Sequence, residues 1–382
     1  MDPVELRRLN LLRDGQTTAT AQVIQDGTDR VAVLSRATGL SRYREKREAH
    51  AEYNGGHPFL RRGIGLATFY HGAGFTGAGE VYLDSRVHVA GLPDGKIEVR
   101  TASTEMGQGM ITIFTQLAAE RLGLAARDVI VAAPDTHRVP DSGPTVASRT
   151  AMIVGRLVEK ACDDLRRSTG LLDTDRGDVV KTAIIVWHQE HEGEELIGEG
   201  RYEPPPGIEW DEENYRGDAY GTFAWATHIA EVEVDLRTYA VRVLDYLAVQ
   251  EVGRVLNETL ARGQIQGGVA QGIGWALLED VVSRDGAMEN TQLTNYIIPT
   301  SRDLPPIRVD FLENPYPHGA KGAKGIGELP LNGPPPAVVN AVVDALGDLL
   351  VEEPSAIPLT PERLMALLDA DAPAPRSVEE RR

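Results

Sequence analysis

The feature of this sequence that most restricts its fold is a recurring arrangement in which β-rich stretches lead into glycine-rich segments beside amphipathic helices. Strand-like stretches at 63–70 and 96–101 lead into STEMGQG at 103–109, after which apolar residues recur at helical spacing. A predicted hairpin at 228–249 precedes QIQGGVAQGIGWALLED, in which we expect AQGIG to open a second helix. A third segment, AKGAKGIGELPLNGPPP, precedes a helix at 337–347. Two such blocks predict an α+β protein with two lobes.

The composition along the chain predicts where the lobes begin and end. Residues 1–58 are polar and have no evident core, which is typical of a connecting segment that packs on another body. Residues 191–215 are acidic and interrupted by Gly and Pro, which is typical of a surface linker. The expected ranges are a connecting segment at 1–58, a first α+β lobe at 59–190, an acidic linker at 191–215, a second lobe with the Glu328 loop at 216–368 and a disordered tail at 369–382.

The charge balance restricts the partners that the chain can have. Its net charge is −18, from 39 basic and 57 acidic residues. Nucleic acids and anionic membranes repel such a protein, so neither is an expected partner. No apolar run approaches the roughly 20 residues of a membrane span. The opening MDPVELRRLNLLRDG lacks the apolar core of a secretory signal, so we expect a cytoplasmic protein.

The cysteine and histidine content restricts redox and metal chemistry. Cys162 is the only cysteine, which excludes an internal disulfide and a cysteine-ligated iron–sulfur cluster within this chain. It lies near the apolar positions of a predicted helix, where we expect a buried, inert thiol. The nine histidines include no HxxxH or HExxH pair, so we expect no zinc site formed by protein ligands. A redox function would therefore need a redox centre and an electron exit from elsewhere.

The glycine-rich segments have two interpretations. Helix N-termini present unpaired N–H groups, and glycine lets the backbone approach a ligand, so the segments can bind an anion. They can also be plain connections. No segment has the pattern of a P-loop or of a dinucleotide-binding turn. The polar stretch DSGPTVAS at 141–148 is equally ambiguous, because it can supply donors to a ligand or begin a helix with Ser142 or Thr145 as N-cap.

Glu328 in GIGEL is a carboxylate within an apolar, glycine-rich loop. The ordinary interpretation is an exposed loop residue. The functional interpretation is a partly desolvated carboxylate that acts as a general base.

The order of these motifs resembles a known family. STEMGQG, SGPTVASRT, QIQGGVAQGIGWALLED, NYIIPTSRDLP, KGIGELPLNGPPPAVVNAV and PLTPERL occur in this order in the molybdenum-binding part of the xanthine dehydrogenase/aldehyde oxidase family. The resemblance extends over residues 2–366. It implies a two-lobed molybdopterin-binding fold and a molybdenum–molybdopterin cofactor, possibly as the cytosine dinucleotide. It also implies that no protein side chain ligates the metal directly.

The resemblance also assigns roles to individual residues. It implies that Glu328 is the catalytic base and that Phe75 and Thr76 in HGAGFTG line the substrate pocket. Gln108 matches a glutamine that hydrogen-bonds the pterin, and Gln271 matches a glutamine near a molybdenum oxo ligand. The complete set of implied cofactor-binding residues is Gly107, Gln108, Gly109, Thr145, Ala147, Ser148, Gln271 and Gly327.

Two departures from the family pattern stand out. Leu329 occupies the position at which xanthine-type enzymes usually have proline. The family's large subunit is about twice as long, and its earlier half, with a GGGFGGK-like loop and substrate-orienting residues, has no counterpart here. Either the subunit is split between two genes, with this chain as its C-terminal half, or the chain is a fragment of a longer subunit; a Met followed directly by DPVELR favours the split. The resemblance implies three partners: a subunit with the N-terminal half, an iron–sulfur subunit with [2Fe-2S] clusters and an FAD subunit.

The function implied by the resemblance is oxidation of an electron-poor carbon in a purine or other N-heterocycle, with water as the oxygen source. An aldehyde, an aryl-CoA or carbon monoxide is an alternative substrate on the same scaffold. A non-catalytic scaffold or cofactor-insertion partner is an alternative of another class, against which the presence of Glu328, Gln108 and Gln271 argues.

Overall fold

A four-stranded sheet organises the larger part of the molecule. The computed structural model describes residues 1–171 and 176–368. The sheet has the strand order β1-β8-β9-β12, with β1 at Leu60–Gly72, β8 at Phe223–Asp235, β9 at Ala240–Glu251 and β12 at Ile307–Leu312. β1, β8 and β9 pair antiparallel, and β12 pairs parallel with β9. The expected 228–249 hairpin is confirmed as part of β8 and β9.

Helices cover both faces of this sheet because side chains alternate along each strand. Ile229 and Leu247 pack against α1 (Pro3–Asn10) and α2 (Arg30–Ser41) on one face. Ala230, Tyr246 and Ala248 pack against α8 (Glu258–Leu277) and α10 (Pro334–Leu346) on the other. The helices α3 (Tyr43–Gly56) and α11 (Pro361–Leu368), and the short turns α9 (Leu329–Asn332) and η4 (Gly347–Leu349), complete this large lobe.

A second sheet forms the core of the small lobe. Its strand order is β4-β3-β2-β5, with β2 at Arg86–Gly91, β3 at Ile97–Arg100, β4 at Val129–Val131 and β5 at Leu196–Arg201. The helices α5 (Met110–Leu122), α6 (Gly155–Ser168) and α7 (Gly177–Glu190) bury its apolar residues. The short helical turns here are α4 (Gly79–Leu83), η1 (Ala126–Asp128) and the π-helical turn η2 (Thr150–Val154). Cys162 on α6 is fully buried, and burial raises the pKa of its thiol, as expected for an inert residue.

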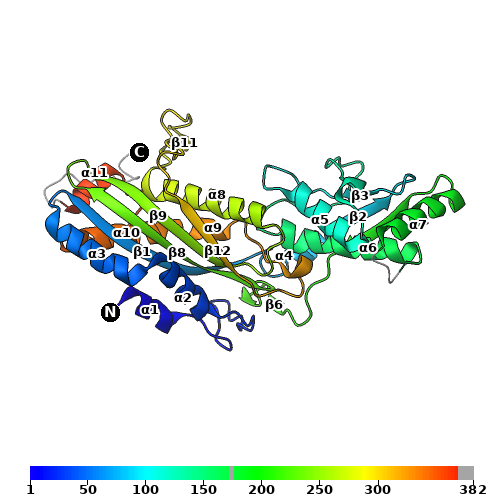
Figure 1. Cartoon of the computed structure of the whole chain (residues 1–382), viewed down its shortest axis with the longest axis horizontal. Coiled ribbons are helices and arrows are strands. Elements are labelled where there is room, and N and C mark those ends of the chain that lie inside the picture. Colours follow the sequence, from blue (N-terminus) through cyan, green and yellow to red (C-terminus); the bar gives the residue numbers. More distant parts are fainter. Residues whose placement is uncertain (172–175, 369–382) are drawn as a thin grey trace.

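Figure 1 shows the two lobes along the long axis of the molecule, which confirms the expected two-lobed α+β architecture. The strand pairings divide the chain differently from the expected ranges. β1, expected in the first lobe, pairs with β8 in the large lobe. β5, expected in the linker, pairs with β2 in the small lobe. The chain therefore crosses between the lobes twice, once after β1 and once after β5. The expected ranges differ because strand pairing depends on partners far away in sequence. The expected tail at 369–382 lies outside the described residues.

The segment 1–58 packs on the large lobe. Val33, Leu34 and Ala37 of α2 share a buried cluster with Ile64 of β1. The body on which this segment packs is the sheet of the same chain.

The second glycine-rich segment does not open a helix, contrary to expectation. α8 begins at Glu258, with Asn257 as its N-cap, so AQGIG lies well inside the helix. Its glycines let neighbouring elements approach closely. A Cβ on Gly268 would lie 2.6 Å from Cγ of Pro330, and one on Gly272 would lie 2.7 Å from Cγ of Pro334. These glycines therefore serve helix packing.

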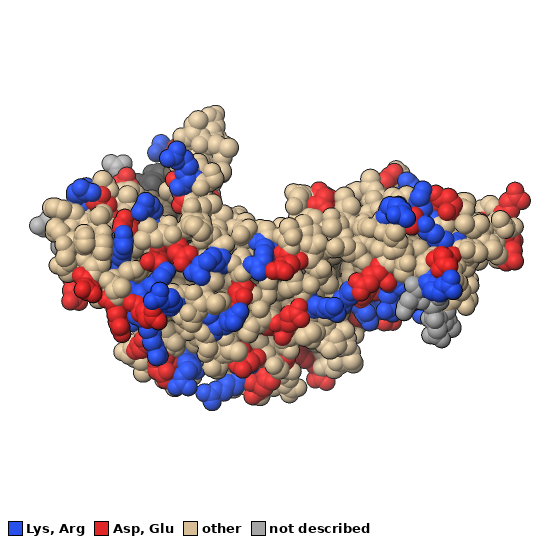
Figure 2. Space-filling view, viewed as in Figure 1, with Lys and Arg blue, Asp and Glu red and all other residues tan. Residues whose placement is uncertain are grey.

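The surface carries charges of both signs, interspersed over the face in Figure 2. Within the described residues, no helix has the length and apolar character needed to cross a membrane.

Candidate functional site

A cavity with a volume of about 400 Å³ is lined by segments of both lobes. The small lobe contributes residues from 106–114 and 145–151, and the large lobe contributes residues from 252–264 and 323–328. Most of the lining is apolar, with Met110, Ile113, Phe114, Val252, Leu256 and Leu260 among its residues. Polar groups from all four segments also line it. An apolar cavity with a few polar groups suits an organic ligand that has flat and hydrogen-bonding parts.

The side-chain carboxylate of Glu105 closes the first glycine-rich loop, to which this residue itself belongs. Oε1 of Glu105 accepts from the N–H groups of Gly107 at 2.8 Å and Gly109 at 2.9 Å, and Oε2 accepts from Ile111 at 3.0 Å. Burial alone would raise the pKa of Glu105, but these N–H groups hold it below its ordinary value. The N–H groups at the start of α5 are therefore already bonded to the Glu105 side chain of the same loop. The anion-binding interpretation of this segment, which needs unpaired N–H groups, does not hold there. The positive φ angles of Gly107 and Gly109, 106° and 86°, permit this tight loop.

Gln108 lies in this loop and lines the cavity. Its Oε1 accepts from the N–H of Met106 at 2.6 Å, and its Nε2 donates to the carbonyl of Thr104 at 2.7 Å. Each amide atom keeps one further hydrogen-bonding position. The side chain is thus fixed in place and can still bind a ligand.

The loop at 141–149 is held by side chains, and neither candidate N-cap begins a helix. The Ser142 hydroxyl donates to the carbonyl of Arg86 at 2.7 Å, and Thr145 Oγ1 accepts from the N–H of Thr104 at 2.8 Å. The chain continues instead through η2 into α6. Thr145, Ala147 and Ser148 all line the cavity.

A buried ion pair fixes the end of the same loop. The Arg149 guanidinium is fully buried and donates to both carboxylate oxygens of Glu80, at 2.7 to 3.1 Å. It also donates to the carbonyl of Ser142 at 2.7 Å. Ala147 and Ser148 are held at φ 54°, a left-handed conformation that needs such support.

Glu328 and Ser148 meet at the edge of the cavity. The Ser148 hydroxyl donates to Oε2 of Glu328 at 2.8 Å, and its oxygen accepts from the Glu328 N–H at 2.9 Å. Nε2 of His71 lies 3.1 Å from the same Oε2. The Glu328 side chain is 50% exposed, so the expected desolvation is not provided by this chain alone. Gly327 lines the cavity beside it.

Sequence reasoning missed several polar residues of the site, among them His71, Arg254, Asn257 and Gln264. His71 is the last residue but one of β1, within the HGAGFTG segment, and only its sequence proximity to Phe75 could have indicated it. Arg254 is exposed on the cavity wall, and its guanidinium forms no ion pair within the described residues. Gln264 lies on the cavity-facing part of α8.

Five expected site residues do not line this cavity: Gly107 and Gly109 belong to the loop that carries Gln108, while Gln271, Phe75 and Thr76 lie elsewhere. Gln271 is exposed on α8, two turns beyond Gln264, and does not line the cavity. Phe75 lines a separate cavity of about 70 Å³. Thr76 hydrogen-bonds Tyr220 at 2.8 Å. The loop that carries Phe75 and Thr76 is bonded to Ala219 and Tyr220, just before β8, so the structure does not bring them to the large cavity.

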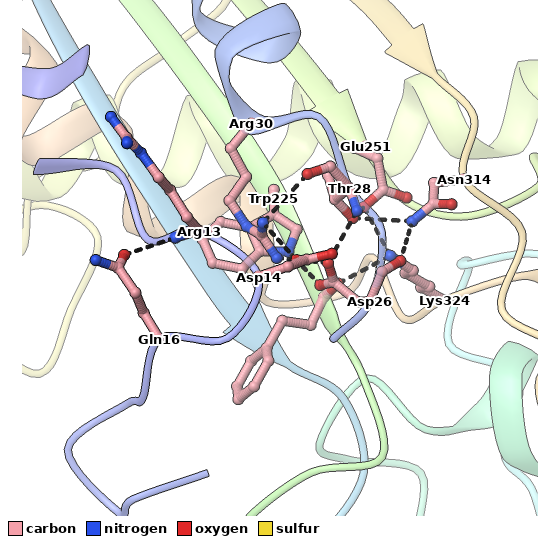
Figure 3. Close-up of polar contacts among 11 residues, drawn as sticks. Arg13, Asp14, Gln16, Asp26, Thr28, Arg30, Trp225, Glu251, Asn314 and Lys324 are labelled. Atoms are coloured by element: carbon pink, nitrogen blue, oxygen red, sulfur yellow. Dashed lines mark hydrogen bonds and ion pairs between the residues drawn. The ribbon is translucent and has the colours of Figure 1, made fainter. Parts of the chain in front are cut away.

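The buried polar network shown in Figure 3 supports the loop that carries Glu328. Nζ of Lys324 donates to Oε2 of Glu251 at 2.7 Å, and both side chains are almost completely buried. Thr28 donates to the same Oε2 at 3.2 Å, and Asn314 donates to Thr28 at 2.9 Å. The segment 13–30, through Thr28, is therefore joined to the Glu328 loop.

Among the described residues, no group of three or more His, Cys, Asp or Glu side chains is placed to hold a metal ion. The site offers amides, hydroxyls, an apolar wall and the guanidinium of Arg254, which has no ion pair in the part of the chain that the structure describes. This set of donors fits an organic cofactor that brings its own metal.

Comparisons with known proteins agree with this arrangement. The chain is 29% identical to the putative xanthine dehydrogenase molybdenum-binding subunit XdhA of Escherichia coli (strain K12), over 95% of this chain and 49% of that protein. It is 28% identical to the nicotine 6-hydroxylase large subunit of Paenarthrobacter nicotinovorans, over 96% of this chain and 47% of that protein. The chain thus spans about half the length of the curated relatives it matches.

Solved structures share the fold over nearly the whole chain. The aldehyde oxidoreductase from Desulfovibrio desulfuricans ATCC 27774 matches with a TM-score of 0.83 and 26% identity, over 97% of this chain and 38% of that one. Quinoline 2-oxidoreductase from Pseudomonas putida 86 matches with a TM-score of 0.81 and 28% identity, over 98% and 50%. The family profile for the molybdopterin cofactor-binding domain matches residues 36–305. The chain therefore belongs to the molybdopterin cofactor-binding family, among the molybdenum-binding subunits of the xanthine dehydrogenase/aldehyde oxidase type.

Proposed function

We propose that this chain forms one half of the cofactor cleft of a multi-subunit molybdenum hydroxylase, with Glu328 as the general base. One observation carries the proposal. The Glu328 carboxylate is held by Ser148 at the edge of a cavity of about 400 Å³ that both lobes line.

The residues at the cavity suit a molybdopterin. Gln108, Thr145, Ala147, Ser148 and Gly327 are the expected cofactor residues that line it. Gln264 adds an amide, and the Arg254 guanidinium, which forms no ion pair among the described residues, suits the phosphate of such a cofactor. Gly107 and Gly109 shape the loop of Gln108, while Gln271 would contact the cofactor from a part of α8 outside the cavity. The cytosine dinucleotide form belongs to the same proposal.

The bound molybdenum centre would supply the two-electron oxidation of the substrate. The role of Glu328 is to accept a proton. Ser148 and His71 both bond Oε2, so Oε1 keeps its lone pairs, with no hydrogen-bond partner among the described residues. Two donors on one oxygen fix the carboxylate plane, and a positioned base of this kind is the usual requirement for general-base catalysis. Water would be the source of the oxygen that the substrate gains.

A purine or another N-heterocycle is the proposed substrate class. Support comes from the names of relatives, which include a xanthine dehydrogenase subunit and a nicotine 6-hydroxylase subunit. An aldehyde is the second candidate, because aldehyde oxidoreductase has the same fold at 26% identity. Xanthine-type enzymes usually have proline at the position of Leu329, and this departure keeps the aldehyde alternative open.

The proposed partners are a polypeptide with the other half of the molybdenum subunit, an iron–sulfur subunit and an FAD subunit, with the assembly in the cytoplasm. The buried Cys162 leaves this chain without a cysteine that could ligate a cluster. Electrons would therefore have to leave through partner-held clusters.

The test is Glu328→Gln in the assembled complex, because glutamine keeps the size and removes the basicity. We expect unchanged molybdenum content and turnover reduced by about 10²–10⁴-fold. Glu192→Gln, which changes an exposed glutamate of the small lobe, is the matched control and should leave both values unchanged. Near-normal turnover of Glu328→Gln would refute the proposed base.

A further inference from the structure

A segment of the large lobe, residues 281–300, extends away from the body of the protein. We call it the arm. It follows α8 and contains the two-stranded β10 (Ser283–Arg284) and β11 (Ala287–Met288), and Figure 1 shows it projecting from the upper side of the large lobe, beside α8. Almost all of its residues are exposed. The arm therefore contributes little to the core of its own chain.

The arm nevertheless has a defined conformation. Asn290, its one buried residue, accepts from the N–H of Val282 at 3.0 Å and donates to the carbonyl of Asp280 at 2.6 Å. Further along, the hydroxyl of Tyr296 donates to Glu279 at 2.7 Å. These bonds tie the arm to the end of α8, so its shape is set before any partner binds.

The exposed side chains of the arm are unusually apolar. Leu293 is 73% exposed, and Ile297 and Ile298 are also exposed. Only Arg284, Asp285 and Glu289 of its twenty residues are charged. Figure 2 shows the arm as a largely uncharged projection on a surface that elsewhere carries many charges. Clustered exposed apolar side chains on an ordered segment indicate a binding surface.

An exposed stripe of α8 connects the arm to the cofactor cavity. Gln264 lines the cavity, Gln271 follows after seven residues, and Trp275 follows after four more. These spacings place all three on one helix face. Gln271 is exposed and Trp275 is 50% exposed. The cavity, the stripe and the arm thus form one continuous surface.

We propose that the arm and this stripe bind the half of the molybdenum subunit that this chain does not span. The inference rests on the proposed function. The chain covers 49% of XdhA and 38% of the aldehyde oxidoreductase chain, so in those proteins this fold is accompanied by a comparable length of further polypeptide. A body docked on the stripe would cover Gln271 and enclose the cavity edge at Glu328. This gives Gln271 a position between the two halves and supplies the water exclusion that Glu328 lacks in this chain.

The test produces this chain and the complementary half as separate polypeptides, the latter defined by alignment with the part of XdhA that this chain does not match. The Kd between them is measured for a triple variant of the arm, Leu293→Ser, Ile297→Ser and Ile298→Ser. We expect association to weaken by about tenfold or more, because the three serines remove apolar side-chain surface whose burial on association favours binding. The matched control is Leu6→Ser, Val31→Ser and Leu40→Ser, on the opposite face of the large lobe, and it should bind normally.

Each outcome decides the proposal. Normal association of the arm variant overturns it, and so does equal weakening by the control. A single Leu293→Arg substitution, with circular dichroism of both variants, separates lost binding from lost folding. A dimer of the chain alone that the arm variant abolishes would instead make the arm a self-association surface and overturn the proposal. Glu328→Gln should associate normally, so lost turnover with intact association tests the base and leaves the arm in place.

Discussion

Replacing Lys324 by methionine should destabilise the protein strongly. The substitution keeps most of the aliphatic chain and removes the ammonium group. Glu251 would then remain buried, with hydrogen bonds from Thr28 and from the N–H of Gly253 at 2.7 Å but without its cation. Breaking a buried ion pair on one side typically costs about 3–5 kcal/mol. We expect the free energy of unfolding of Lys324→Met to fall by that amount.

The loss should depend on pH in a defined direction. Burial already raises the pKa of Glu251 in the presence of Lys324, and removal of the cation raises it further. A carboxyl group with a raised pKa in the folded state favours folding in its protonated form. The deficit of Lys324→Met should therefore be smallest below the unfolded pKa of about 4.3 and grow as pH rises through the folded pKa.

The assay is urea unfolding followed by circular dichroism, combined with amide exchange of the loop 322–328. The Glu328 N–H, which donates to Ser148, should lose protection. Lys321→Met, at the residue just before this loop, is the control, because its ion pair with Glu120 is more exposed and should be worth less than about 1 kcal/mol.

A double variant provides the sharpest check. Lys324→Met with Glu251→Gln leaves no buried charge, so much of the lost stability should return. A Lys324→Met deficit below about 1 kcal/mol, or a double variant no more stable than the single one, would refute the view that this pair holds the loop.

Two other predictions concern elements away from this pair. Hydrogen bonds from His50 and Lys46 hold the pKa of Glu231 at about 2 against the opposing effect of burial. This carboxylate therefore stabilises the fold above its unfolded pKa of about 4.3. Acid titration from that pH down to a pH of about 2 should destabilise the wild type more than Glu231→Gln. Gly268→Ala should lower the free energy of unfolding measured in urea. Its clash with the Pro330 ring costs about 1–3 kcal/mol, which outweighs a helix-propensity gain of about 1 kcal/mol. Gly267→Ala is the control and should keep that gain, because there is open space around its Cβ.

Local patterns in the sequence predicted the parts of the fold that depend on neighbouring residues. Apolar spacing indicated α5 and α6, and turn residues indicated the hairpin of β8 and β9. The pairing of β1 with β8 could not be predicted in this way, because the two strands are separated by the whole small lobe. Glycines in α8 were misleading for a related reason. Their use is set by Pro330 and Pro334 on other elements, which no local window contains.

The candidate site shows the same division. Motif resemblance found Gln108, Ser148 and Glu328, and the structure places all three at one cavity. It did not indicate His71, which reaches Glu328 only because the end of β1 meets the loop before α9. Nor could it show that Glu105 occupies the start of α5, since this depends on how the loop closes on itself.

The Glu328 loop is supported by charge because it has few side chains with which to pack. Residues 322–328 include Gly322, Gly325 and Gly327. At Gly325 a Cβ would lie 2.3 Å from the carbonyl oxygen of Ser148, so the close approach that brings Glu328 to Ser148 requires glycine. A glycine-rich loop also has many accessible conformations, and apolar contacts cannot select among them when the side chains are absent. Lys324 selects one of these loop conformations, because its ammonium has one buried position, between Glu251 and the carbonyl of Phe223. The desolvation of a buried ion pair makes it a weak source of net stability. We infer that its contribution here is a single position for the carboxylate that follows four residues later.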